Sequence, residues 1–346
     1  MLKKIRFSVI FPVLAALVLI AAQCNPRSTE IPSGEEKSMV EVQEQVEAAE
    51  EPPELAPVSL GAGEKLKVVA TTNIVADIVR QVGGDMIDLT PLLPAGSDPH
   101  SFQATPRDLA NVAEAHLVFA NGMGLEEFLD EVLENSGGEA ALVHVSQGVK
   151  ARGMETEEAQ EEKGEEHAHN SNVDPHTWTS PANVVVFVQN IEQALNALDP
   201  ANAAAYRANA ESYEHQLAEL DAWVKTQIET IPADNRKLVT DHAVFGYYAD
   251  RYGLEQVGAV IPAPTTAAEP SAKELANLEN AIREYEVKAV FVGNTVNPAL
   301  SEQVAEDTGT RLLTLYTGSL GPEGSGVESY LDYIRYNTNT IVQGLK

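Results

Sequence analysis

Three of the eight histidines stand where a ligand site is expected. His100 and His176 each complete the tripeptide Asp-Pro-His, and His242 directly follows the apolar run Lys237–Asp241. All three come at or after the carboxyl end of a predicted β-strand, the edge at which open α/β sheets bind ligands. Three converging imidazoles suit Zn²⁺, whereas Mg²⁺ and Ca²⁺ prefer oxygen ligands. On spacing alone, three unrelated surface histidines remain the alternative.

The other five histidines have different surroundings. His116 and His144 lie beside or within apolar runs and His215 within a predicted helix, which favours structural or surface roles, while His167 and His169 lie in an acidic segment. Three histidines and a water are also the metal set of zinc hydrolases. The sequence contains no His-Glu-x-x-His and offers no evident general base for such a water. We therefore expect a binding protein and no enzyme.

Short β-rich runs alternate with helical segments on both sides of a long helical stretch. Because helices separate successive strands, the pattern predicts an α/β protein with two lobes built on mainly parallel sheets. The predicted strands are Leu66–Thr72, Met86–Leu93, Leu117–Asn121 and Ala141–Ser146, then Lys237–Asp241, Leu254–Ile261, Val287–Val292 and Arg311–Tyr316. Two candidate ligands thus come from the first lobe and one from the second.

The stretch between the lobes has no strand signal. Asp199 is a good N-cap and Pro200 suits the first helical position, so a second helix is predicted to begin there. One amphipathic face is formed by Leu217, Leu220, Val224, Ile228 and Ile231. If Pro200–Ile231 is a single helix, it spans roughly 48 Å at about 1.5 Å per residue, enough to cross both lobes. An ordinary surface helix within one domain is the alternative.

The N-terminus has the features of an export signal. Lys3, Lys4 and Arg6 precede an uncharged apolar run that is too short to span a membrane, which needs about 20 residues. Cys24 is the only cysteine, so no internal disulfide can form. It resembles the cysteine of a bacterial lipobox, although Gln23 stands where that motif has Gly, Ala or Ser. We expect lipidation at Cys24, with an ordinary cleavable signal or an uncleaved anchor as alternatives.

The charge balance limits the partners of this 346-residue chain. Lys and Arg number 23 against 52 Asp and Glu, a formal net charge of −29. Such a charge repels nucleic-acid phosphates and anionic lipid, so neither is expected to bind. Residues 25–64 are rich in Glu and Pro and predict an extended tether. Residues 154–172 form an acidic insertion with two histidines, which we expect to be either a weak accessory collector of cations or a solvated segment without a role.

Several motifs together resemble the cluster A-I metal-binding receptors of ABC transporters, the zinc and manganese uptake family. The first two contain His100 and His176 and are residues 96–108 (GSDPHSFQATPRD) and 174–181 (DPHTWTSP). The third contains His242, and two more fit the end of the chain: residues 240–248 (TDHAVFGYY), 296–300 (VNPAL) and 316–321 (YTGSLG). The match extends from about Leu66 to Leu345, with the motifs in the family's order and spacing.

The resemblance implies two four-stranded α/β lobes joined by a long rigid helix, with a metal ion held between them by His100, His176 and His242. Many family members have an aspartate where Gly318 stands, and manganese receptors often have a glutamate in place of His242. Three nitrogen ligands without that carboxylate favour Zn²⁺ over Mn²⁺. The resemblance also implies an exported, lipid-anchored monomer at the outer face of the cytoplasmic membrane or in the periplasm, with an ABC permease as partner. A manganese receptor and a surface adhesin remain the alternatives.

The expected organisation follows from these features. It comprises a signal peptide (1–23), an acidic tether (24–64), an N-terminal lobe (65–182) carrying the insertion, a helical linking segment (183–233) and a C-terminal lobe (234–346).

Overall fold

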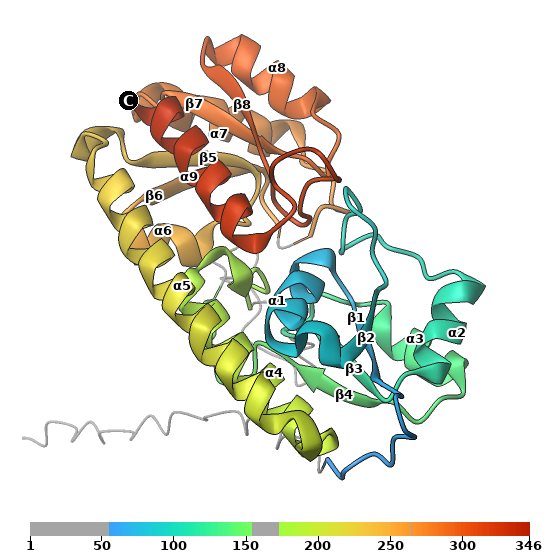
Figure 1. Cartoon of the computed structure of the whole chain (residues 1–346). Coiled ribbons are helices and arrows are strands. Elements are labelled where there is room, and N and C mark those ends of the chain that lie inside the picture. The colour runs from blue at the N-terminus through green and yellow to red at the C-terminus, as the bar shows by residue number, and fades with distance from the viewer. Residues whose placement is uncertain (1–54, 154–172, 264) are drawn as a thin grey trace, which may run out of the picture. The chain divides into compact units, whose positions relative to one another are not determined.

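A computed structural model describes residues 55–153, 173–263 and 265–346 (Figure 1). The expected signal peptide, Cys24, most of the tether and the acidic insertion lie outside the described residues. Within the described part of the chain, no helix is both long and apolar enough to cross a membrane.

The N-terminal lobe is built on a parallel four-stranded sheet with the order β2-β1-β3-β4. Its strands are β1 (Leu66–Ala70), β2 (Ile87–Pro91), β3 (Leu117–Ala120) and β4 (Ala141–His144). The helices that connect them are α1 (Asn73–Gly83), α2 (Pro106–Glu114) and α3 (Leu129–Ser136). Thr105 begins α2 with a capping box in which its side chain and that of Asp108 each accept a backbone N–H. Local sequence therefore fixes where α2 begins.

The C-terminal lobe repeats this plan with a sheet of order β6-β5-β7-β8, again parallel throughout. The strands are β5 (Lys237–His242), β6 (Glu255–Ile261), β7 (Ala289–Gly293) and β8 (Arg311–Leu315). The helices are α6 (Gly246–Tyr252), α7 (Ala272–Glu284), α8 (Ala299–Thr308) and α9 (Tyr330–Leu345). In both sheets the central pair of strands is buried, as expected for parallel sheets covered on both faces.

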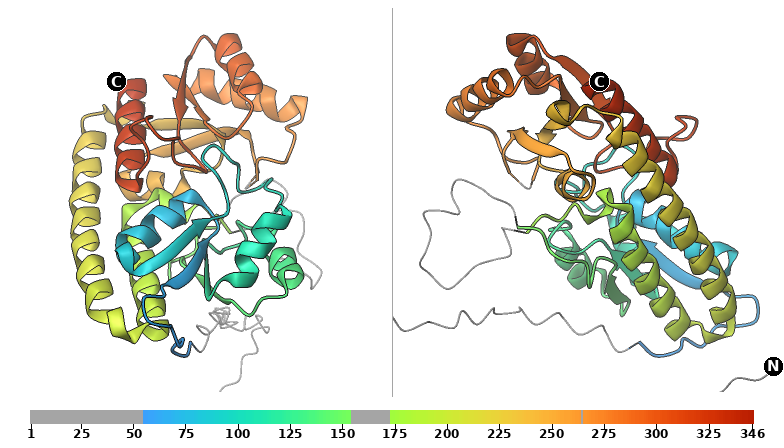
Figure 2. Two further views of the ribbon diagram at one scale, coloured as in Figure 1. Left: turned by 45° about the vertical axis from the view of Figure 1, so that its right-hand side comes forward. Right: turned by 90° about the vertical axis from the view of Figure 1, so that its left-hand side faces the viewer.

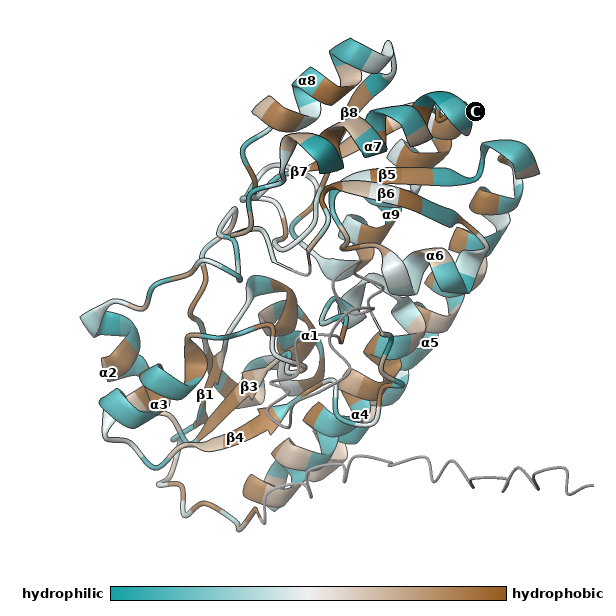
Figure 3. Ribbon diagram, turned by 180° about the vertical axis from the view of Figure 1, so that it is seen from behind, coloured by the Kyte–Doolittle hydropathy of each residue, from teal (hydrophilic) through white to brown (hydrophobic). Residues whose placement is uncertain are grey.

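Each sheet is covered by helices on both faces (Figure 2). On the outer faces, α2 and α3 pack on the first sheet, and α7 and α8 pack on the second, each pair around its own small apolar cluster. The other faces share one large core, in which residues of α1, α4 and α5 meet residues of α6 and α9. Figure 3 shows hydrophobic residues on the strands and polar residues on the outward faces of the outer helices. The two lobes thus have a continuous apolar core.

Two helices join the lobes: α4 (Pro181–Leu198) and α5 (Ala203–Glu229). The expected single helix from Pro200 is wrong at its start, because Pro200–Asn202 form a 3₁₀ turn before α5. Asp199 does not cap the backbone; its Oδ2 accepts hydrogen bonds from Asn202 Nδ2 and Tyr206 Oη, both at 2.7 Å. The 27 residues of α5 still reach about 40 Å, and α5 contacts α1 and α4 of one lobe and α6 and α9 of the other.

The sequence-based expectation of two four-stranded α/β lobes is confirmed. Every predicted strand is present, and no end differs by more than two residues from the one expected. The assigned strand β1 ends at Ala70, although single backbone hydrogen bonds to its neighbours continue past that residue. Thr71 N, for example, donates to Phe119 O at 2.9 Å beyond the end of β1.

The shared core predicts that shortening a buried side chain of α5 strongly lowers the free energy of unfolding. Leu220 is fully buried in the core cluster, whereas Glu211 on the same helix is exposed. Leu220→Ala should lower the free energy of unfolding by about 2–5 kcal/mol, because the site cannot fully collapse around the missing atoms. Glu211→Ala should change it by no more than about 0.5 kcal/mol. Urea denaturation of the metal-free protein measures both, and equal losses would contradict a core centred on α5.

Candidate metal centre

The three candidate histidines come from three different structural contexts. His242 is the last residue of β5, a central strand of the C-terminal sheet. His176 precedes the 3₁₀ turn Thr177–Thr179, which leads directly into α4. His100 lies in the connection from β2 to α2. His242 ends its strand, and His100 and His176 lie beyond the carboxyl ends of β2 and β4 along the chain, as the sequence predicted.

The structure brings the three imidazoles together. One ring nitrogen of each lies within 4.8 Å of those of the other two, and Nε2 of His100 and Nε2 of His176 are 3.1 Å apart. The ring centroids are separated by 5.1 to 5.8 Å, and the rings meet edge to face. His176 and His242 are buried, while His100 is partly exposed. Among the described residues, this is the one group of histidine, cysteine and acidic side chains arranged to hold a metal ion.

Each of the two buried histidines has an aspartate beside its Nδ1 atom. His176 Nδ1 lies 2.8 Å from Asp174 Oδ1, which also accepts the backbone N–H of His176 at 3.0 Å. His242 Nδ1 lies 3.3 Å from Asp241 Oδ2 as an ion pair, although neither His242 Nδ1 nor either Asp241 oxygen makes a hydrogen bond. A carboxylate at Nδ1 keeps the proton on that nitrogen and leaves Nε2 free for a metal ion. The sequence analysis did not single out these aspartates, although each lies one or two residues before its histidine.

Burial and charge move the pKa values of the three rings in different directions. Burial, with the neighbouring imidazoles His176 and His242, lowers the pKa of His100 to about 2. Burial also lowers the pKa of His176, more than Asp174 raises it. Burial lowers the pKa of His242 as well, but Asp241 and more distant carboxylates outweigh burial and raise it above its ordinary value. Two rings are therefore neutral near pH 7, and the third holds a proton more tightly.

A buried hydrogen-bond network supports the segment that carries His176. Asn121 Nδ2 donates to Pro175 O at 2.9 Å, and Thr177 Oγ1 donates to Asn121 Oδ1 at 3.2 Å. Asn121 is in turn fixed by the buried carboxylate of Glu126, which accepts the Asn121 backbone N–H at 2.7 Å and a hydrogen bond from Thr71 at 2.6 Å. Burial raises the pKa of Glu126 despite these donors. The site is thus built on the rigid end of the first sheet.

Contacts between the lobes surround the histidines. Trp178 Nε1 donates to Thr317 O and Tyr333 Oη, both at 3.2 Å. Thr266 Oγ1 donates to Asp98 beside His100, and Asn73 Nδ2 donates to Ser319 Oγ at 2.9 Å. These contacts hold the two histidines of the first lobe against the one from the second.

Gly318 lies beside the site, where the family resemblance placed an aspartate. A Cβ atom at Gly318 would lie 2.7 Å from Cδ of Pro99, the residue before His100. Because a proline ring cannot turn away, any side chain at residue 318 requires the backbone of one lobe to move. In this arrangement of the lobes, therefore, residue 318 supplies no ligand and its neighbour leaves no space for one.

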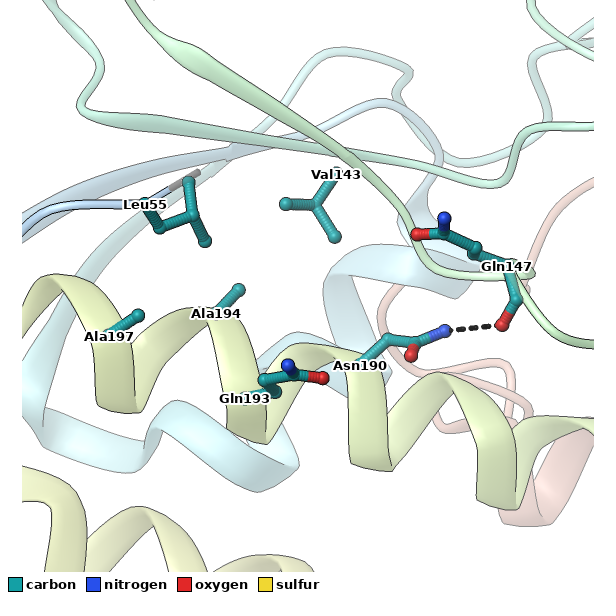
Figure 4. A pocket seen from close by; sticks show the side chains of 7 residues that line it. All are labelled: Leu55, Val143, Gln147, Asn190, Gln193, Ala194 and Ala197. Atoms are coloured by element: carbon teal, nitrogen blue, oxygen red, sulfur yellow. Dashed lines mark hydrogen bonds between the residues drawn. The ribbon is translucent and has the colours of Figure 1, made fainter. Parts of the chain in front are cut away.

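The other described histidines lie apart from this cluster. His116 is at the opposite, amino end of β3, where its Nδ1 accepts the Lys67 backbone N–H at 3.0 Å. His215 is exposed on α5 with Glu219 3.6 Å away, and His144 ends β4 outside the group. A cavity of about 220 Å³ beside α4 and β4 is also separate from the site (Figure 4). It is lined by aliphatic and amide side chains with no titratable group: Leu55, Val143, Gln147, Asn190, Gln193, Ala194 and Ala197.

Comparison with known proteins places the chain in a family. Residues 68–344 match the family described as "Zinc-uptake complex component A periplasmic". The chain belongs to this family. Its members are metal-binding receptors of zinc and manganese ABC transporters, which capture an ion without chemical conversion, so the expectations of a receptor and of no enzyme are confirmed.

Individual zinc-uptake family members differ in the ion that their names give. The manganese-binding lipoprotein MntA of Halalkalibacterium halodurans is 32% identical over 82% of this chain and 89% of its own length. The manganese ABC transporter substrate-binding lipoprotein PsaA of Streptococcus mitis is 33% identical over 82% and 90%. The solved structure of the periplasmic zinc-binding protein TroA of Treponema pallidum is similar with a TM-score of 0.71 and 27% identity, covering 81% of this chain and 99% of that one.

The raised pKa of His242 predicts how metal binding depends on pH. Below that pKa, His242 is protonated and a metal ion must displace one proton, whereas His100 and His176 are already neutral. Affinity should therefore fall about tenfold per pH unit below the pKa of His242 and level off above it. Chelator-competition titrations from pH 8.5 to 6.5, where His100 and His176 are neutral, measure the slope.

The control for this titration is Asp241→Asn, which removes the charge that raises the pKa of His242. The decline in affinity should then begin at lower pH than in the wild type. A flat profile, or a fall of about a hundredfold per unit, would contradict a single titrating ligand.

Proposed function

We propose that this protein captures Zn²⁺ outside the cytoplasm with one imidazole nitrogen each from His100, His176 and His242, and delivers it to the permease of an ABC transporter. The observation that carries this proposal is the convergence of three ring nitrogens from two lobes within 4.8 Å. Tetrahedral Zn²⁺ with Zn–N bonds of about 2.1 Å requires nitrogens about 3.4 Å apart. The 3.1 Å between His100 and His176 is close to that, and small ring movements bring His242 into range.

The donor set supports zinc. Imidazole nitrogen is a borderline-soft ligand that binds Zn²⁺ more strongly than Mn²⁺, whereas Mn²⁺ is better served by carboxylate oxygen. No acidic side chain belongs to the cluster among the described residues, and Gly318, where many family members have an aspartate, packs against Pro99. Asp174 and Asp241 lie beside the outer nitrogens of the rings, where they orient the ligands instead of binding the ion.

Manganese is the second candidate, and the comparisons support it better than zinc, because both relatives named above are described as manganese proteins. We extend to this chain the description of both relatives as lipoproteins, and that of PsaA as part of an ABC transporter. Cys24, outside the described residues, would carry the lipid, and residues 24–64 would tether the receptor near its permease.

Direct competition decides between the ions. At equal free concentrations, wild-type protein purified without an affinity tag should retain Zn²⁺ in preference to Mn²⁺, because three imidazole ligands favour the later metal of the divalent series. Metal content after dialysis against buffered mixtures of both ions measures this preference. Tighter retention of manganese would overturn the assignment of zinc while leaving a metal receptor in place.

Removing one ligand tests the site itself. His176→Ala should weaken Zn²⁺ binding by at least about a hundredfold, because a three-nitrogen site loses a donor and gains an unfilled buried space. His116→Ala is the matched control, since His116 lies at the other end of the first sheet. Isothermal titration of both variants against the wild type gives the comparison. Similar affinities for the two variants would refute the three-histidine site.

A further inference from the structure

Arg152 links the two lobes at a point that the metal ligands do not reach. Its guanidinium donates from Nε to Asp250 Oδ2 on α6 at 2.9 Å, and its Nη1 lies 3.5 Å from Asp174 Oδ2 in the first lobe. The Arg152 side chain is 28% exposed, Asp250 is 64% exposed and Asp174 is fully buried. Asp174 is therefore shielded from water and needs the positive charge of Arg152 for its stability. Asp250 is solvated and needs that charge far less.

The contacts continue from Arg152 to a ligand of the proposed metal site. Asp174 uses Oδ2 toward Arg152 and Oδ1 toward His176, where it accepts from both the backbone N–H and Nδ1. The backbone is held as well, because Asp174 N donates to Arg152 O at 2.8 Å. Asp174 thus stands between a cation and an imidazole, with one oxygen committed to each.

Helix α6 closes this arrangement from the second lobe. Tyr247 Oη donates to Asp174 O at 2.9 Å and accepts the Arg152 backbone N–H at 3.0 Å. A Cβ atom on Gly246 would lie 2.5 Å from Asp174 Oδ2 and 2.6 Å from Arg152 Nη1, so only glycine permits this approach. Since α6 begins four residues after His242, the group that touches Arg152 moves with the third metal ligand.

We propose that Arg152 is a positioning residue that couples contact between the lobes to the orientation of His176. With α6 in place, the guanidinium holds Asp174 by its outer oxygen, and the inner oxygen fixes His176 with Nε2 toward the ion. When α6 moves away, Arg152 loses Asp250, Asp174 loses Tyr247, and the imidazole loses its fixed direction. Separation of the lobes thereby loosens the ion, which is what a receptor needs at the moment of delivery. This inference rests on the proposed function, because it requires His176 to bind the cargo.

The test is a set of variants in the full mature chain with Zn²⁺ as the probe. Arg152→Gln should raise the dissociation constant about tenfold, mainly because Zn²⁺ is released faster. This is the lower end of the 10–100-fold effects seen for groups that orient metal ligands. Arg152→Lys, which keeps the charge, should recover part of the loss. Arg251→Gln is the matched control: it breaks an α6 ion pair with Asp221 on α5, away from the histidines, and should stay within twofold of the wild type. Chelator competition gives affinity, and stopped-flow chelation gives the release rate.

A double-mutant cycle separates positioning from general support. In an Asp174→Asn background, Arg152→Gln should add less than about twofold, because its effect passes through that carboxylate. Arg152→Gln matching Arg251→Gln, or an undiminished effect in the Asp174→Asn background, would overturn the inference. If Arg152→Gln fails to fold, Arg152→Lys and Asp250→Asn are measured in its place. Wild-type release rates in both of these variants would equally overturn the inference. Failure of the wild type to bind either Zn²⁺ or Mn²⁺ would instead refute the proposed function.

Discussion

The apolar core that runs along α5 through both lobes is the constraint on which the rest of the structure depends. Seven buried side chains of α5 belong to it: Tyr206, Ala210, Tyr213, Leu217, Leu220, Val224 and Ile228. Because the same helix packs against α1 and α4 on one side and α6 and α9 on the other, each lobe is fixed by contacts with one rigid rod. The histidines of the two lobes meet because this shared core holds the lobes together. A local hinge would not give the same precision.

Burying three imidazoles side by side is unfavourable unless they stay neutral or gain a counter-charge. The protein uses both solutions. His100 is kept neutral by burial and by its neighbours, and it reaches the site from a loop that remains partly open to water. His176 and His242 are fully enclosed, and each has a buried aspartate behind it. The carboxylates therefore compensate the charge of a bound cation from outside the set of atoms that would touch it. This arrangement would keep the ligands of the proposed site all nitrogen in a chain whose formal net charge is −29.

The fold followed from the sequence because it rests on local patterns: apolar runs separated by helices predict parallel strands, and parallel strands place their carboxyl ends at one edge. His100, His176 and His242 could be selected for that reason. Asp241 stands directly before His242, but nothing in the sequence shows that it lies beside the ring nitrogen. Arg152 could not be selected at all, since its role depends on contacts between residues far apart in the chain. Arg152 reaches Asp250 across 98 residues of chain. The contact of Gly318 with Pro99 is likewise a consequence of how the lobes pack, and the 3₁₀ turn at Pro200 reflects side-chain bonds of Asp199.

Trp178 gives the molecule a built-in optical property. Its indole ring lies edge to face with the ring of His176, 5.3 Å between centroids, and its N–H is bonded to the second lobe. The chain has only one other tryptophan, Trp223 on α5, whose ring lies beneath the guanidinium of Arg335. An imidazolium ring in contact with an indole quenches its emission by accepting an electron. A neutral or metal-bound imidazole quenches that emission to a different extent. The ultraviolet emission of the unlabelled protein is therefore expected to contain one component that senses the charge state of His176, a ligand of the proposed site, and one that does not.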